Sequence, residues 1–231
     1  AMNPSTGEVL AMVSKPDYNP DSKVLEQGWK QMVESKEYPF LSRATQGLYI
    51  PGSIYKTVIA AAAIEKGMGD GLYEDEGVIV IDGKEIRNFG SKAYGQINLK
   101  KALAVSSNTV FAQIAVELGE ENLRSTAENF GFGRGIPFDI PTSQSVFPYK
   151  NMSKTDMAAV GMGQGKLLTT PLHMAMVTSS IANGGIMMRP LLVRDITSPL
   201  GNVIYNSKPE ELYKTMGYGT SREVTEMMLE T

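Results

Sequence analysis

The sequence predicts an α+β fold, with helices concentrated in the middle of the chain and short strand pairs outside it. Two observations carry this prediction. Capped, apolar helical segments recur from residue 53 onward, and hairpin patterns centre on Asp82-Gly83 and on 198–201. The strands and helices do not alternate as they do in a parallel sheet, which favours α+β with a mainly helical subdomain. With 231 residues, 42% of them apolar, the chain can bury a sizeable core.

The first elements in the chain are short. Residues 1–14 are typical of two strands joined by a turn at 5–7, although a first strand this short cannot support a hairpin alone. Residues 22–36 indicate a helix, with Ser22 as its candidate N-cap.

The segment 53–66 predicts the strongest helix. Pro51-Gly52 precedes it, its interior is rich in Ala, and Gly67 follows it. Its apolar residues surround the helix axis instead of forming one stripe, so we expect this helix to be buried on most sides.

The middle and the C-terminal part contain further start and stop signals. Asp82-Gly83 between two strand-like runs indicates a two-residue hairpin. Residues 98–118 are helical around the polar step Ser106-Ser107-Asn108, and another helix covers 120–130. The remaining expected elements are a helix with a Ser153/Asp156 capping box, a Thr170-Pro171 helix ended by 183–185, a hairpin over 190–205, and a last helix with a Thr220/Glu223 capping box.

Composition excludes several kinds of chemistry. There is no Cys, so thiol nucleophiles, disulfides and Cys-based metal sites are ruled out. The single His, His173, rules out metal sites built from several His. A net charge of −3 argues against nucleic-acid binding through bulk charge. We expect no metal and no cofactor, and a side-chain nucleophile would be Ser or Thr with Lys, Asp or Glu as its base.

Ser53 and Lys56 are the candidate nucleophile and base. The spacing Ser-x-x-Lys at the start of a buried helix places both side chains on one face. The positive end of the helix dipole and partial burial both disfavour a protonated Lys, which could then take the Ser proton. The Ser53 backbone N–H, in the first turn, can face an oxyanion. The alternative from this segment alone is an N-cap Ser beside a solvated Lys.

The polar step Ser106-Ser107-Asn108 interrupts an apolar helical run. By itself it is typical of a step between two helices, with Ser or Asn capping the next turn. Beside a Ser–Lys pair, a hydroxyl and an amide in a cleft could instead relay a proton and hold a substrate carbonyl.

These motifs together resemble those of the penicillin-binding proteins and the related serine β-lactamases, which use Ser-x-x-Lys, Ser-x-Asn and Lys-Thr-Gly in this order. YIPGSIYK matches the first motif and SSN the second. NPSTGEVLAMVSKPDYNP resembles the opening strand pair of the family, and GMGQGKLLTTPLHMAMVTSSIANGG resembles its Gly-Gln-Gly segment and following helix. The resemblance covers nearly the whole chain and is closest to the monofunctional D,D-transpeptidases of cell-wall synthesis.

The resemblance implies roles for single residues. Ser53 would attack the D-Ala-D-Ala carbonyl of a peptidoglycan stem peptide, or the ring carbonyl of a β-lactam antibiotic. Lys56 would be its general base, Ser106 would pass a proton toward the leaving group, and Asn108 would bind the donor's amide carbonyl. Ser107 receives no catalytic role.

Weaker assignments concern the next segment. Gln164, between Gly163 and Gly165, would line the cleft as part of a substrate-binding turn. His173 is expected to be a residue of the core or of a helix surface, without a catalytic role.

The same resemblance implies an incomplete domain over 1–231, with a helical subdomain at roughly 68–160 inserted between α/β parts and helices on the faces of an antiparallel sheet. No Lys-Thr-Gly occurs in the 231 residues. We expect this motif beyond Thr231, so the 231 residues alone would hold half an active site and would be inactive. Further expectations are other cell-wall synthesis proteins as partners, no nucleic acid, and a place on the outer face of a bacterial membrane, anchored by a segment outside this chain.

Two alternatives remain open at this stage. One is hydrolysis, by a D,D-carboxypeptidase or a β-lactamase; Glu128 is the only Glu between Asn122 and Pro209, which disfavours fast deacylation. The other is a β-lactam sensor or a degenerate homologue that only binds partners, and the intact Ser53–Lys56 and Ser106/Asn108 sets argue against degeneracy.

Overall fold

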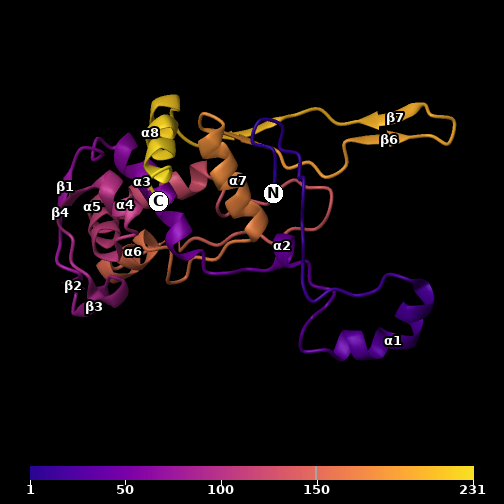
Figure 1. Cartoon of the computed structure of the whole chain (residues 1–231), viewed down its shortest axis with the longest axis horizontal. Coiled ribbons are helices and arrows are strands. Elements are labelled where there is room, and N and C mark those ends of the chain that lie inside the picture. Colours follow the sequence, from indigo (N-terminus) through magenta and orange to yellow (C-terminus); the bar gives the residue numbers. More distant parts are fainter. Residues whose placement is uncertain (149) are drawn as a thin grey trace.

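The computed structural model describes residues 1–148 and 150–231 (Figure 1). The helical elements are α1 (Ser22–Glu34), α2 (Arg43–Gln46), the 3-10 turn η1 (Gly52–Tyr55), α3 (Lys56–Glu65), the 3-10 turn η2 (Phe89–Ser91), α4 (Leu99–Ala104), α5 (Asn108–Asn129), α6 (Lys154–Gly161), α7 (Pro171–Ala182) and α8 (Tyr218–Met228). The strands are β1 (Leu72–Asp75), β2 (Val78–Ile81), β3 (Lys84–Arg87), β4 (Gly95–Asn98), β5 (Ile186–Met188), β6 (Asp195–Thr197), β7 (Val203–Asn206) and β8 (Glu211–Lys214).

The α+β class is confirmed, and the antiparallel pairing takes a specific form. In the part of the chain that the structure describes, the strands form separate two-stranded pairs: β1–β4, β2–β3, β5–β8 and β6–β7. The residues of the β2–β3 turn, Asp82 and Gly83, both have positive φ, of 46° and 76°, as a two-residue hairpin turn requires. The expected hairpin over 190–205 is also present, but its first strand begins at Asp195.

Helix α3 is the centre of the core. Residues 58–63 are almost completely buried, as the apolar pattern around the axis predicts. The expected helix 53–66 differs at its start, because Gly52–Tyr55 form a 3-10 turn and the α-helix begins at Lys56. Figure 1 shows α3 surrounded by other helices of the body, whereas α1 and the β6–β7 hairpin project away from it. No residue of α1 is buried.

Local capping rules explain several helix starts. Ser107 caps α5 by accepting a hydrogen bond from the Val110 N–H at 3.1 Å. The Ser153/Asp156 capping box at α6 and the Thr170 cap of α7, with Pro171 as its first residue, are confirmed. The two helices expected over 98–118 and 120–130 are divided differently. α4 ends at Ala104, and α5 continues through a non-helical Gly119 to Asn129.

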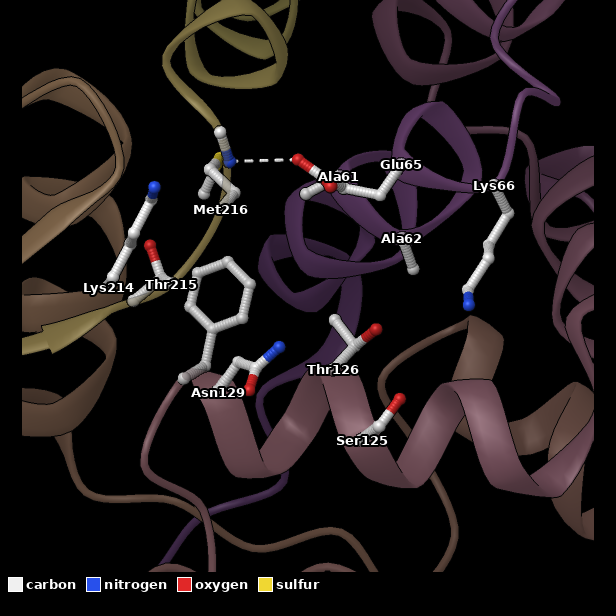
Figure 2. A pocket seen from close by; sticks show the side chains of 12 residues that line it. Ala61, Ala62, Glu65, Lys66, Ser125, Thr126, Asn129, Lys214, Thr215 and Met216 are labelled. Carbon is white, nitrogen blue, oxygen red and sulfur yellow. Dashed lines mark hydrogen bonds between the residues drawn. The ribbon is translucent and has the colours of Figure 1, made fainter.

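Two predicted caps are wrong. Asp21, not Ser22, caps α1, since its carboxylate accepts hydrogen bonds from the Lys23 and Val24 N–H groups. At α8 the N-cap is Gly217, and the expected Thr220/Glu223 capping box does not form. The reason is that the Glu65 carboxylate at the end of α3 accepts a hydrogen bond from the Gly217 N–H at 2.8 Å and another from the Thr220 hydroxyl at 2.6 Å. Figure 2 shows Glu65 with one of these hydrogen bonds as a dashed line. A tertiary partner from α3 therefore replaces the local one.

His173 is a core residue, as expected. Its side chain is 1% exposed on α7. Nε2 lies 2.8 Å from the Phe130 carbonyl oxygen, so Nε2 carries the proton, and Nδ1 accepts from the Ser145 hydroxyl at 2.6 Å. Burial lowers the pKa of His173 to about 4, and the imidazole therefore stays neutral in the folded protein at neutral pH.

This burial predicts a pH-dependent loss of stability. As the pH falls from 6.5 toward 4, the unfolded chain protonates His173 while the folded chain does not, so the free energy of unfolding falls by about 3 kcal/mol from this residue. His173→Gln removes this contribution. Urea unfolding at pH 7 and pH 4.5 should show the wild type losing about 2–3 kcal/mol more than the variant. Equal losses in both proteins would contradict the prediction.

Candidate active site

Lys56 joins the two motifs that the sequence singled out. Its side chain is 0% exposed at the first residue of α3. The Nζ atom donates to the Ser106 carbonyl oxygen at 2.7 Å, to the Ser106 hydroxyl at 3.0 Å and to the Asn108 Oδ1 at 2.8 Å. These three acceptors match the three protons of an ammonium group. Residues some fifty positions apart in the sequence thus meet at one cation.

The surroundings of Lys56 change its acid–base behaviour. Burial lowers the pKa of Lys56 to about 8, because the interior disfavours the charged form. The Phe111 ring, with its centroid 5.6 Å from Nζ, forms part of this apolar environment. An amine with such a pKa is neutral in about a tenth of molecules at pH 7, which suits it to act as a general base.

Ser53 is exposed in the η1 turn, one turn before Lys56 on the same chain segment. Among the described residues no hydrogen bond joins the Ser53 hydroxyl to Lys56. Ser53 lines two cavities, of about 540 and 300 Å³, and Ser106 lines both as well. Ser53, Ser106 and Asn108 line the larger cavity, and the buried Lys56 is hydrogen-bonded to the last two. The chemical roles assigned to these four residues stay predictions.

The larger cavity contains residues that the sequence analysis did not select. They come from the segment after β3 and are Asn88, Phe89, Lys92 and Tyr94. The Phe89 side chain is 99% exposed at this wall. The sequence offers no signal for them, because only the folding of β2–β3 against α5 brings this segment to the cleft.

The Gly163–Gly165 turn packs against the backbone immediately before Ser53. The Gly52 N–H donates to the Gly163 carbonyl at 2.8 Å, and a Cβ added at Gly163 would collide with the Gly52 carbonyl. With φ of 71°, position 163 requires glycine for both reasons. Gln164 is exposed beside it, and the substrate-binding role of Gln164 and Gly165 stays a prediction.

Three further features concern metal binding, a separate cavity and the lengths of the helices. In residues 1–148 and 150–231, no group of three or more His, Cys, Asp or Glu side chains is arranged to hold a metal ion. The cavity of about 390 Å³ in Figure 2 lies between α3, α5 and the β8–α8 junction and does not include Ser53. Across the same described residues, every helix is too short or too polar to span a lipid bilayer.

Comparison with known proteins decides the family. A sequence model described as the penicillin-binding protein transpeptidase domain matches residues 1–231. The chain belongs to this transpeptidase family. Among curated relatives of the transpeptidase, peptidoglycan D,D-transpeptidase PbpA of Mycolicibacterium smegmatis is 32% identical over 99% of this chain and 49% of its own length. The PbpA of Mycobacterium tuberculosis is 33% identical over 97% of this chain and 47% of its own length.

Solved structures of the transpeptidase family agree closely with this fold. Penicillin-binding protein A from M. tuberculosis, solved as an imipenem acyl-enzyme complex, matches with a TM-score of 0.93 and 28% identity. The match covers 99% of this chain and 55% of that one. The chain thus spans about half the length of the curated relatives it matches.

The burial of Lys56 predicts that its side chain loses a proton at a lower pH than an exposed lysine does. Because burial lowers the pKa of Lys56 to about 8, its side-chain nitrogen should titrate near pH 8. Nitrogen-15 NMR of lysine-labelled protein measures this midpoint. Lys56→Met identifies the signal, which disappears in the variant. A midpoint above pH 10 would contradict the buried environment.

Proposed function

We propose that this transpeptidase-family chain carries the Ser53-dependent acyl-transfer site of a peptidoglycan D,D-transpeptidase. The observation that carries the proposal is the buried Lys56, held by Ser106 and Asn108 beside a cleft that Ser53 lines. The names of the similar proteins and the β-lactam acyl-enzyme structures among them support the substrate class.

In the first half-reaction, the Ser53 Oγ attacks the carbonyl between the two D-Ala residues of a stem peptide. Neutral Lys56 takes the Ser53 proton, and the tetrahedral oxyanion faces the Ser53 N–H in the first turn of η1. As the C–N bond breaks, Ser106 donates a proton to the departing D-Ala amine and is reprotonated by Lys56. An ester of Ser53 and a released D-Ala result.

In the second half-reaction, the amine of another stem peptide attacks the ester carbonyl. The amine loses a proton to Lys56 or to a group bonded to Lys56, and Ser53 takes up a proton as it leaves. The cross-link therefore forms without a net change in the number of protons on the enzyme. A β-lactam reacts by the same first attack. Its ring C–N bond opens, but the leaving nitrogen stays attached, so the acyl-enzyme persists.

Asn108 is oriented for binding a substrate carbonyl. Its Oδ1 accepts from Lys56, and its Nδ2 donates to the Arg87 carbonyl at 2.8 Å. The second N–H of Nδ2 would donate a hydrogen bond to the amide carbonyl of the stem peptide that acylates Ser53. The exposed Ser53 hydroxyl must approach Lys56 when substrate binds, since such hydrogen bonds tighten in the Michaelis complex.

The proposal includes a cellular setting inferred from the family. The protein would act on the outer face of a bacterial membrane, anchored outside this chain, with other cell-wall synthesis proteins as partners in growth or division. Its covalent reaction with β-lactams would make it a determinant of antibiotic response. A D,D-carboxypeptidase and a β-lactam sensor or degenerate binding module are the alternatives that the following experiment separates.

Acylation at Ser53 is tested on the protein at its full natural length. Fluorescent penicillin should label a peptide that contains Ser53, and Ser53→Ala should reduce labelling about 100-fold or more. Ser125→Ala, in α5 at the separate cavity of Figure 2, should label like the wild type. Full labelling of Ser53→Ala would refute the nucleophile.

A D-Ala-D-Ala thioester donor with an amine acceptor then separates the classes. Amide formation supports transpeptidation, hydrolysis alone supports a carboxypeptidase, and acylation without turnover supports a sensor.

The third family motif gives a further prediction. The 231 residues contain no Lys-Thr-Gly, which in the family completes the site. We expect a polypeptide of these 231 residues alone to react with fluorescent penicillin slowly or not at all, while the protein at full natural length labels at Ser53. Second-order labelling rates measured side by side test this, and equal rates would refute it.

A further inference from the structure

A buried carboxylate lies directly behind the Ser106–Asn108 segment. Asp75, the last residue of β1, is 0% exposed. Its Oδ1 accepts hydrogen bonds from the Gly77 N–H at 2.9 Å, the Asn88 Nδ2 at 2.7 Å and the Thr109 hydroxyl at 2.9 Å. Its Oδ2 accepts from the Ser107 hydroxyl at 2.7 Å. These four hydrogen bonds compensate for the burial of the carboxylate, and none of the four donors carries a positive charge.

Asn88 extends this network to the backbone of the site. Its Oδ1 accepts from the N–H groups of Asn108 at 2.8 Å and Thr109 at 3.1 Å. These N–H groups belong to the first turn of α5, where the helix itself offers no acceptor. The neighbouring Arg87 carbonyl accepts from the Asn108 side chain at 2.8 Å. The end of β3 therefore sets both the backbone and the amide orientation of Asn108.

The segment so held is strained. Ser106 has φ of 53°, a left-handed conformation that is unfavourable for a non-glycine residue and persists only where its surroundings enforce it. In this conformation both its carbonyl and its hydroxyl accept from Lys56. The next residue, Ser107, links to Asp75 and also caps α5. The Asp75 carboxylate thus holds Ser107, which lies between Ser106 and Asn108, the two residues that contact Lys56.

We propose that Asp75, with Asn88, is a positioning residue that holds Ser106 and Asn108 in the geometry that Lys56 requires. This inference rests on the proposed acyl transfer and deepens it. Asp75 does not line the cleft cavities and contacts no reacting atom, so it acts through Ser107, Asn88 and Thr109. Its predicted effect is on the acylation rate of the folded protein, beyond any effect on stability.

Asp75→Asn tests the proposal with little change in shape. The amide offers one acceptor oxygen instead of two, and its NH₂ group faces Ser107. The Ser107 hydroxyl must then turn its proton toward the Thr109 hydroxyl oxygen, at 3.2 Å, or toward the Asn88 Oδ1, at 3.4 Å, where it competes with the Asn108 and Thr109 N–H groups. We expect the second-order rate of fluorescent-penicillin acylation, on the protein at full natural length, to fall at least tenfold. Amide hydrogen exchange at Asn108 and Thr109 should accelerate as well.

Asp156→Asn is the matched control. Asp156 also accepts a 2.7 Å hydrogen bond from a Ser hydroxyl at a helix start, that of Ser153 at α6, but it lies outside the cleft. Its variant should keep the acylation rate within twofold of the wild type. Thr109→Val, which removes one donor to Asp75 and keeps the side-chain shape, serves if Asp75→Asn fails to fold. This variant should lower the rate at least threefold.

The outcomes distinguish the two proposals. If the wild type is acylated at Ser53, a folded Asp75→Asn or Thr109→Val protein with the wild-type rate overturns the positioning role, even if its melting temperature is lower. If the wild type is not acylated at Ser53, the proposed function fails. Hydrogen exchange then decides the network separately: unchanged exchange at Asn108 and Thr109 in Asp75→Asn overturns it, and faster exchange supports it.

Discussion

The ammonium group of Lys56 and its three oxygen acceptors are the interaction on which the site depends. A buried cation without partners would be strongly disfavoured, so the fold must supply acceptors from outside α3. Ser106 and Asn108 supply all three from the α4–α5 step. Because these contacts join the central helix to the long helix α5, the same hydrogen bonds fix the relative position of two core elements and of the Ser-x-x-Lys and Ser-x-Asn motifs.

Two of the small strand pairs, β1–β4 and β2–β3, support the contact between Lys56 and the start of α5. β1 ends at Asp75 and β3 ends at Arg87, and the ends of these strands lie against the start of α5. Isolated two-stranded pairs are marginally stable in water, so their stability comes from packing on the helices. In return they place the Asp75 carboxylate and the Arg87 carbonyl at the start of α5, where these groups accept hydrogen bonds from the side chains of Ser107, Asn108 and Thr109. The polar network and the helical core are thus mutually dependent.

Much of the local structure follows from the sequence by short-range rules. The Ser153/Asp156 box, the Thr170 cap and the Asp82-Gly83 turn need only neighbours a few residues away. Two of the features that the sequence did not predict have the same cause, a hydrogen-bond partner that is distant in the chain. Thr220 pairs with Glu65, which lies 155 positions earlier in the chain, and a local pattern cannot anticipate such a partner. Asp75 was missed for the same reason: between Glu74 and Glu76 it reads as part of a solvated acidic run, yet it is fully buried.

By itself the sequence determined the candidates for the site: a Ser-x-x-Lys pair at a helix start and a Ser-x-Asn step, in a chain with no thiol and a single His. These are properties of composition and spacing, and they limit a side-chain nucleophile to Ser or Thr and its base to Lys, Asp or Glu. Only the tertiary structure decided that Lys56 is buried against Ser106 and Asn108, that its pKa falls to about 8, and that Asp75 stands behind them. Burial and proton affinity depend on which distant segments exclude water from a group, and chain folding alone sets that arrangement.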